Sequence, residues 1–435
     1  MADGGSSAVR KKQLPNKLPE AEEVSLEYIE ATDFVIDKFQ NTSVCGHKER
    51  QDLCGESSDS CDFNLIGIEH ADTAPLRIPV EDDAWSWGAD SVEMQMPRVD
   101  DRNMDIMRTD LTWEQKVVKV LNMIRCKGLT EYNHKLQIPV PTRFCLFNIA
   151  LFDLDEESQI EPRPLLREIP ASDYWKLENS VNLISIKVAV SDVGYPVNIF
   201  GTVLARDQVD YRCVYLFKRG RDNPQLIKSP VDTLTLTGPG RALAVTDTMY
   251  FEFHLKIKDD EAVDKDFCKG LLEHNTARHT IQPMNLKLES WLSTVELAFT
   301  LVPFAVEASL TVSILKGPST FIGNIVAWTS GNDKNEIILY DSQVAGTQRK
   351  LGTDGSIVLT RYIVAVPLDE DLVLNVSLCG SDEAECMKFI IGNDVETCTN
   401  TIGPYELQVK VVWRGIIKQR RPNMWEYFGG VRVLR

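Results

Sequence analysis

Long hydrophobic runs are missing from this 435-residue sequence. Its most apolar stretch, residues 297–310, is interrupted by Pro303 and Glu307, whereas a membrane-spanning helix needs roughly 18 or more consecutive apolar residues. The first twenty residues are polar and rich in basic side chains, so the apolar core of a secretory signal is missing as well. We therefore expect an intracellular protein, cytoplasmic or nuclear, without a membrane span and with its ten cysteines mostly as thiols.

The sequence also lacks the short motifs that mark several common enzyme classes. The turn Gly238-Pro239-Gly240 is not followed by the Gly and the Lys-Ser/Thr pair that a phosphate-binding loop requires. Neither the Gly-x-Ser-x-Gly turn of serine hydrolases nor the His-Glu-x-x-His helix of zinc proteases occurs. These absences predict a non-enzymatic protein with no catalytic residues and no cofactor.

Cysteine and histidine residues at the spacing of known metal sites are also missing. Structural zinc sites usually place cysteines in close pairs, and the cysteines near the N-terminus are spaced irregularly. We expect no metal site, and we expect ordinary thiols and exposed imidazoles in both groups that contain cysteine and histidine. These groups are Cys45, His47, Cys54 and Cys61, and Cys268 with His274 and His279.

Basic residues are outnumbered, with 47 Lys and Arg against 64 Asp and Glu, which gives a net charge of −17. Residues 1–110 hold 24 acidic and 11 basic side chains, so −13 of this charge lies in the first quarter of the chain. Such a surface repels phosphate backbones, which makes general nucleic-acid binding unfavourable. We expect a protein partner of unknown identity instead, and the oligomeric state stays open.

Changes in composition divide the chain into an acidic region, a lead-in region, a β domain and a basic, aromatic tail, at residues 1–108, 109–180, 181–413 and 414–435. The acidic region alternates charged, Ser-rich and short apolar pieces without periodicity, so we expect it to be largely disordered. The tail is interpreted as a solvated or core-docking extension, a nuclear-import patch or a dock for the acidic region.

The lead-in region predicts a helix followed by a strand. Thr112 and Gln115 have capping-box spacing, and a run of apolar residues at helical intervals ends at Gly128. Residues 143–152 are rich in β-forming side chains and are expected to form the lead-in strand.

From residue 181 onward, apolar and polar residues alternate, which places one wet and one dry face on each strand. Ile184, Ile186, Val188 and Val190 form one apolar row, whereas Glu252 and Glu307 fall on polar rows. This pattern favours antiparallel over parallel sheets. We predict an all-β fold, an antiparallel β-sandwich of Greek-key type with a barrel as the alternative. Residues 259–279 are expected to form a helical or irregular insertion.

Charged residues cluster at the predicted strand ends and turns of the first half of the β domain. One interpretation is that carboxylates and guanidinium groups lock the loops through charge-assisted hydrogen bonds. The other is a site for an anion or phosphate group that uses the surplus arginines. The candidates are Arg206, Asp207, Asp210, Arg219, Arg221, Asp222 and Arg241.

Several ordered motifs carry a resemblance to a known family. They are Gly201-Thr-Val-Leu-Ala-Arg-Asp-Gln-Val-Asp210, Phe217-Lys-Arg-Gly-Arg-Asp-Asn-Pro-Gln225, Leu236-Thr-Gly-Pro-Gly-Arg241 and Phe251-Glu-Phe-His-Leu-Lys-Ile-Lys258. Together with later stretches, they resemble DUF6598, a domain of unknown function found in grasses, over about residues 143–413. The resemblance implies a plant protein from a family without an assigned activity, and it assigns no catalytic residue.

Similar domains accompany a ribosome-inactivating (rRNA N-glycosylase) domain in some plant chains, which implies a stress or defence context. That enzyme class needs a Glu-Ala-x-Arg helix, whereas Glu307-Ala308 lies in an alternating strand pattern. The leading hypothesis is a non-enzymatic binding or interaction module. One alternative is an accessory or diverged partner of ribosome-inactivating proteins. The other is calcium-dependent lipid binding by sandwich loops, for which the candidate carboxylates are Asp153 and Asp155, Asp264 and Asp266, and Asp369 and Asp371.

Overall fold

The computed structural model describes residues 111–145, 148–160, 162–245, 248–258, 263–275, 283–379 and 385–417. The expected disordered region 1–108 and all but the first four residues of the 414–435 tail lie outside these ranges. Two compact units divide the chain, Met1–Glu114 and Gln115–Arg435. The architecture below belongs to the second unit, apart from the first two residues of its helix.

The predicted helix is confirmed as α3 (Trp113–Gly128). Its buried side chains are Val118 and Cys126, and its last turn carries basic residues where the negative end of the helix dipole favours them. A short antiparallel hairpin follows, formed by β1 (Thr130–Asn133) and β2 (Ile138–Pro141).

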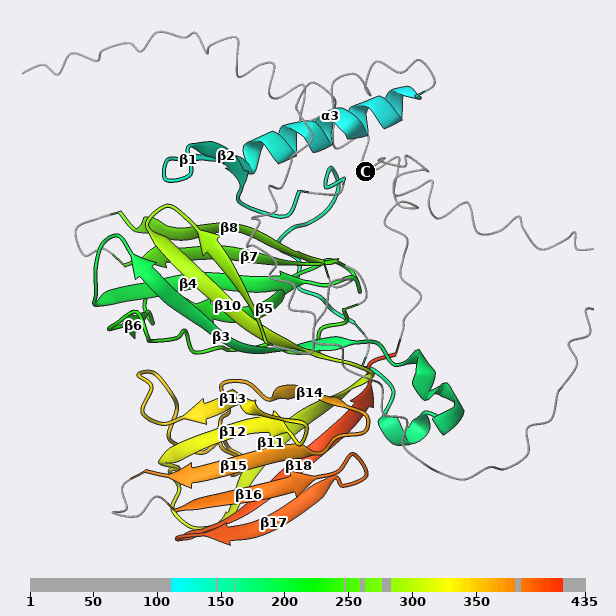
Figure 1. The fold of residues 1–435 in the computed structure, drawn as a ribbon, viewed down its shortest axis with the longest axis vertical. Coiled ribbons are helices and arrows are strands. Elements are labelled where there is room, and N and C mark those ends of the chain that lie inside the picture. Colours follow the sequence, from blue (N-terminus) through cyan, green and yellow to red (C-terminus); the bar gives the residue numbers. More distant parts are fainter. Residues whose placement is uncertain are drawn as a thin grey trace, which may run out of the picture. The chain divides into compact units, whose positions relative to one another are not determined.

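The next strands form a first β-sandwich (Figure 1). One sheet has the order β3-β10-β9, and the other has the order β5-β4-β7-β8, with β6 also pairing β4. Every pairing is antiparallel. Aromatic side chains such as Phe251, Phe253 and Phe299 from the two sheets pack into one buried core. The strands are β3 (Ser180–Ser191), β4 (Val197–Arg206), β5 (Val214–Arg219), β6 (Gln225–Ile227), β7 (Thr248–Ile257), β8 (Lys265–Asn275), β9 (Met284–Glu289) and β10 (Ser293–Val302).

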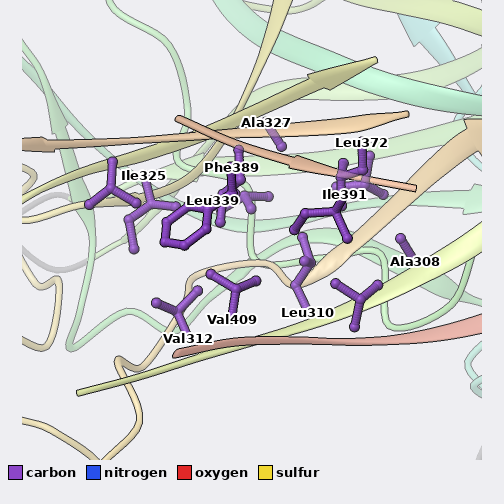
Figure 2. Close-up of a cluster of buried hydrophobic side chains, with 14 of the residues drawn as sticks. Ala308, Leu310, Val312, Ile325, Ala327, Leu339, Leu372, Phe389, Ile391 and Val409 are labelled. Atoms are coloured by element: carbon purple, nitrogen blue, oxygen red, sulfur yellow. The ribbon is translucent and has the colours of Figure 1, made fainter. Parts of the chain in front are cut away.

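A second β-sandwich pairs the sheets β14-β11-β18-β17 and β13-β12-β15-β16, again antiparallel throughout. Figure 2 shows how Leu310 and Val409 of one sheet point toward Leu339, Phe389 and Ile391 of the other. The strands are β11 (Ala305–Lys316), β12 (Gly323–Thr329), β13 (Asn332–Asp341), β14 (Ile363–Pro367), β15 (Leu372–Leu378), β16 (Cys386–Ile391), β17 (Thr397–Ile402) and β18 (Tyr405–Gly415).

The two sandwiches share a junction inside the second unit. Strand β10 passes directly into β11, and Asn182 of β3 donates its side-chain amide to the carbonyl of Ala365 at 2.7 Å and accepts from the Ala365 N–H at 2.9 Å. A small cluster of buried residues, including Ala242, Val302, Ile363 and Ile416, fills this junction. The all-β, antiparallel prediction with a preceding helix is therefore confirmed, and the predicted sandwich region contains two packed pairs of sheets.

The expected strand at 143–152 does not form in the described residues of this segment. Its backbone groups are paired by side chains instead of a strand ladder. The Phe144 N–H donates to Glu252 Oε1 at 2.6 Å, the Ile149 N–H donates to Asn122 Oδ1 at 2.8 Å, and Arg125 donates to the Ile149 carbonyl at 2.6 Å. Apolar side chains here predicted a strand, but they fill a separate core with Tyr250 and Leu271.

The prediction of a helical or irregular insertion at 259–279 is also wrong, because strand β8 occupies Lys265–Asn275 and pairs with β7. A register shift opposite Leu255 and Lys256 breaks the alternation of β8, so Phe267 and Cys268 are both buried although they are adjacent. Because of this irregular spacing, the sequence of β8 does not show the two-residue alternation that predicts a strand.

Candidate functional site

Arg206 lies at the end of β4 with no exposed surface, and its guanidinium group forms a bidentate pair with Glu252 of β7. Nε donates to Oε1 at 2.8 Å and Nη2 donates to Oε2 at 3.0 Å. The guanidinium group also donates to two backbone carbonyls. Nη2 donates to that of Leu154 at 2.6 Å, and Nη1 donates to that of Tyr211 at 2.8 Å. Each nitrogen of this guanidinium group therefore donates to an acceptor of the protein.

Glu252 also holds the lead-in segment against the sheet. It accepts from the Phe144 N–H, and Arg143 approaches its Oε2 at 3.3 Å while pairing with Asp155 at 2.9 Å. The Phe144 ring stacks on Tyr211 and lies 5.7 Å from the Arg206 guanidinium carbon, in cation–π contact. Glu252 was assigned to a wet face by its alternating pattern, and its burial shows that this assignment was wrong.

Asp207 and Arg241 form a second buried pair next to the first. Arg241 Nη1 donates to Asp207 Oδ2 at 2.6 Å, and Nη2 donates to Oδ1 at 2.9 Å. Burial alone would raise the pKa of Asp207, but the charge and hydrogen bonds of Arg241 and the Ala244 N–H hold that pKa below its ordinary value. Arg241 also donates to Ser158 Oγ, which in turn donates to Asp210 at 2.8 Å.

A third buried pair links the lead-in region to β11 of the second sandwich and is not among the sequence candidates. Arg163 Nη1 donates to Glu307 Oε2 at 3.0 Å, and the same oxygen accepts from the Ala242 N–H at 2.8 Å. Burial lowers the pKa of Arg163, and the charge of Glu307 only partly offsets this. Glu307 lies on a strand row that the sequence pattern assigned to solvent, so only its burial in the fold reveals its role.

The seven sequence candidates do not meet at one rim. Arg219 pairs in register with Gly201, five residues along β4 from Arg206. At about 3.4 Å per residue, this separates the two positions by roughly 17 Å along the strand. The structure brings Asp207, Asp210 and Arg241 together near Arg206, whereas Arg219, Arg221 and Asp222 lie at the opposite end of β5 and in the turn after it.

Arg219 differs from the other arginines in this set. Its side chain is half-buried, and in the described part of the chain its buried Nε and Nη1 have no hydrogen-bond acceptor. Burial, with no carboxylate to oppose it, lowers the pKa of Arg219. By contrast, Arg221 donates Nε to Asp264 Oδ2 at 2.8 Å on the surface, and Asp222 is exposed.

A loop of the second sandwich lies against Arg219. Gly346 has a φ of +86°, and a methyl group at its Cα would lie 3.2 Å from Arg219 Nη1 and 3.2 Å from Asn223 Oδ1. The neighbouring Thr347 has a buried hydroxyl that, in the described residues, finds no hydrogen-bond partner. A guanidinium and a hydroxyl without protein acceptors therefore occur on facing segments.

Three of the six carboxylates considered for calcium pair with basic residues. Asp155 pairs with Arg143, Asp264 pairs with Arg221, and Asp266 lies 3.7 Å from Lys269. Within the described ranges, no group of three or more His, Cys, Asp or Glu side chains is placed to hold a metal ion.

Of the two groups of cysteine and histidine, one lies partly within the described residues. Burial raises the pKa of Cys268 to about 12, and His274 is buried rather than exposed as expected. His279 and the group formed by Cys45, His47, Cys54 and Cys61 lie outside the described residues. Among the helices of the described chain, none is long and apolar enough to cross a membrane.

Comparison with solved structures gives only low similarity. Human GIVD cytosolic phospholipase A2 shares 7% identity with a TM-score of 0.19, over 55% of this chain and 32% of that chain. The chain therefore spans about a third of the phospholipase. The C2A and C2B domains of extended-synaptotagmin 2 share 7% identity with a TM-score of 0.20, over 61% of this chain and 96% of that chain. Scores this low support no argument about function.

No curated protein sequence matches the chain. The sequence profile of one family does match it, over residues 180–411, which is more than half of its length. This match agrees with the resemblance drawn from the motifs between Gly201 and Lys258. The protein belongs to the family of the domain of unknown function DUF6598.

Proposed function

We propose that this protein is a non-enzymatic binding module that recognises an anionic group, a carboxylate or a phosphate, on its partner through Arg219. The observation that carries this proposal is the half-buried guanidinium of Arg219, whose Nε and Nη1 have no acceptor in the described part of the chain. A buried donor left without a partner costs about 1–3 kcal/mol, so the site gains when an acceptor arrives. The planar fork of arginine suits bidentate binding of carboxylate and phosphate oxygens.

The surroundings of Arg219 support an anion rather than a neutral ligand. No ion pair of the described residues involves Arg219, and the Thr347 hydroxyl on the facing loop supplies a second donor without a partner. A Cβ at Gly346 would lie 3.2 Å from Nη1, so glycine allows the backbone of this loop to approach the guanidinium group closely. The site thus combines positive charge with two kinds of donor that lack an acceptor among the described residues.

The other charged candidates support the non-enzymatic part of the proposal. Arg206 and Arg241 donate their hydrogen bonds to Glu252, Asp207 and backbone carbonyls. This favours a role in locking the loops over a catalytic role. Three of the six carboxylates considered for calcium, Asp155, Asp264 and Asp266, have basic partners, which gives calcium-dependent lipid binding less support. Glu307 lies in strand β11 and pairs with Arg163, so the Glu-Ala-x-Arg helix of ribosome-inactivating enzymes gains no support.

Isothermal calorimetry on the full chain tests this proposal, with inorganic phosphate and citrate as probes. We expect Arg219→Gln to weaken binding at least tenfold. Arg221→Gln, two residues away and paired on the surface, is the matched control and should bind as the wild type does. Unchanged binding by Arg219→Gln would remove the proposed site. The plant source, the stress or defence context and the cytoplasmic or nuclear location stay predictions.

A further inference from the structure

Arg361 is a buried arginine at the junction of the two sandwiches, outside the charged cluster described above. It precedes β14, and only 2% of its surface is exposed. Nε donates to the Ile338 carbonyl of β13 at 3.0 Å, and Nη1 donates to the Leu183 carbonyl of β3 at 2.8 Å. Its side chain therefore links a strand of each sandwich.

The charge of Arg361 has no carboxylate partner in the described part of the chain. None of the ion pairs found there includes this arginine, and its third nitrogen, Nη2, is buried without an acceptor. Burial is the cause that lowers the pKa of Arg361 to about 9, and no acidic group opposes it. The side chain still carries its proton at neutral pH, so an uncompensated positive charge is buried here, which is unfavourable unless something neutralises it.

A cavity of about 10 Å³ lies beside this guanidinium group. Its lining comes from both sandwiches and combines polar atoms with apolar side chains, those of Val181, Pro239, Ala242, Ile337 and Ile363 among them. The other polar side chain in the lining, Asn182, already uses its amide on both backbone groups of Ala365. This volume accommodates one occupant of about the size of a water molecule.

We propose that this cavity binds a single small monovalent anion, chloride, against Nη2 of Arg361. The lining residues include two polar side chains, Asn182 and Arg361, and a water molecule between them would leave the buried guanidinium charge uncompensated. A halide needs no acceptor from the protein and cancels the buried charge directly. Phosphate and carboxylate groups are too large for the cavity. Because Arg361 already holds Leu183 and Ile338, the bound ion stabilises the junction between the two sandwiches.

Thermal unfolding of the full chain tests this site, with sodium chloride and sodium gluconate compared at equal ionic strength. Chloride should raise the Tm by several degrees, and the Tm should keep rising with the logarithm of the chloride concentration above the Kd, because the ion binds only the folded state. Gluconate is too large for the cavity and should not raise the Tm in this way. Equal shifts in the two salts would overturn the proposal.

Variants separate this site from the rest of the protein. Arg361→Met should lose the chloride-specific rise in Tm. Arg349→Met should keep it, because Arg349 is an exposed arginine of the same sandwich that donates to the Ser342 carbonyl. Arg219→Gln should also keep it, so that failure of the anion site on Arg219 and failure of the chloride site are distinguishable.

One measurement remains decisive if Arg361→Met does not fold. Crystals of the wild-type chain grown in sodium bromide should give an anomalous difference peak within hydrogen-bonding distance of Arg361 Nη2. Density there without an anomalous signal would identify a water molecule and overturn the proposal.

Discussion

Arg206 and Glu252 form a buried bidentate ion pair across β4 and β7, with Nε–Oε1 and Nη2–Oε2 distances of 2.8 and 3.0 Å. The same carboxylate accepts from the Phe144 N–H, so a single side chain holds the sheet and the lead-in segment together. The value of such a pair lies less in its net attraction than in the cost of breaking it, because the surviving partner is left charged in the interior.

Glu252→Ala is therefore expected to lower the free energy of unfolding by about 3–5 kcal/mol, since it strands the Arg206 charge and the Phe144 N–H. Asp264→Ala is the control, because its ion pair with Arg221 lies near the surface and should contribute about 1 kcal/mol or less. Urea denaturation of both variants measures the difference. If both variants lost the same free energy of unfolding, the buried pair would contribute no more to stability than the surface pair.

The two carboxylates of the buried pairs show where sequence patterns stop being informative. Alternation placed Glu252 and Glu307 on polar faces, and both residues do alternate with apolar neighbours. A pattern cannot tell a solvated polar face from one covered by another segment. The covering partners, Arg206 and Arg163, lie 46 and 144 residues away, so the pairing depends on tertiary packing alone.

The strands themselves were largely predictable, but their registers were not. The predicted apolar row of β3 fails at both ends, because register shifts opposite β10 leave Ile184 and Ala189 without direct partners. Each extra residue is a bulge that turns the following side chains to the other face. Ile186 and Val188 between the bulges are buried, whereas Val190 beyond them is exposed.

The charged candidates show the same division. Turn and strand-end positions drew attention to Asp207 and Arg241, and the structure pairs these two side chains. The antiparallel register of β4 and β5 places Arg206 and Arg219 at opposite ends of this pair of strands. Without the register, the sequence could not separate arginines that lock loops from one that lacks a partner.

The buried pair of Asp207 with Arg241 predicts how stability depends on pH. The folded-state pKa of Asp207 is lowered, so its contribution is present above the unfolded-state pKa of about 3.9 and is lost as the pH falls through the folded value. The wild-type free energy of unfolding should therefore decline as the pH drops below about 4. Asp207→Asn should be less stable at pH 7 and should show a shallower decline in acid. Urea titrations from pH 7 to pH 3 check this, and parallel curves would contradict it.

Cysteine reactivity should follow burial. Cys268 lies in the first core with a pKa of about 12, so almost none of it is thiolate at pH 8 in the folded protein. Cys386 is exposed and is the internal control. Treatment with iodoacetamide followed by peptide mass spectrometry should find Cys386 modified and Cys268 protected until denaturant is added. Rapid modification of Cys268 in the native protein would contradict its placement.

The second core predicts a contrast between two leucines of β11. Leu310 is 3% exposed and points into the core of Figure 2, whereas Leu315 is 48% exposed. Leu310→Ala should lower the free energy of unfolding by about 2–5 kcal/mol through lost burial and a residual cavity. Leu315→Ala should change it by about 0.5 kcal/mol or less. A similar cost for both, measured by urea denaturation, would reject the assigned faces of β11.

The proposed anion site at Arg219 is tested most directly by the NMR signal of its own side chain. In the full chain labelled with ¹⁵N-arginine, the Nε–H resonance of Arg219 is assigned from its disappearance in Arg219→Lys, and that of Arg221 from Arg221→Lys. Titration with inorganic phosphate should shift the Arg219 resonance in a saturating manner and leave the Arg221 resonance in place. An Arg219 resonance that does not move, or moves only as Arg221 does, would contradict the proposal that this guanidinium receives an anionic group.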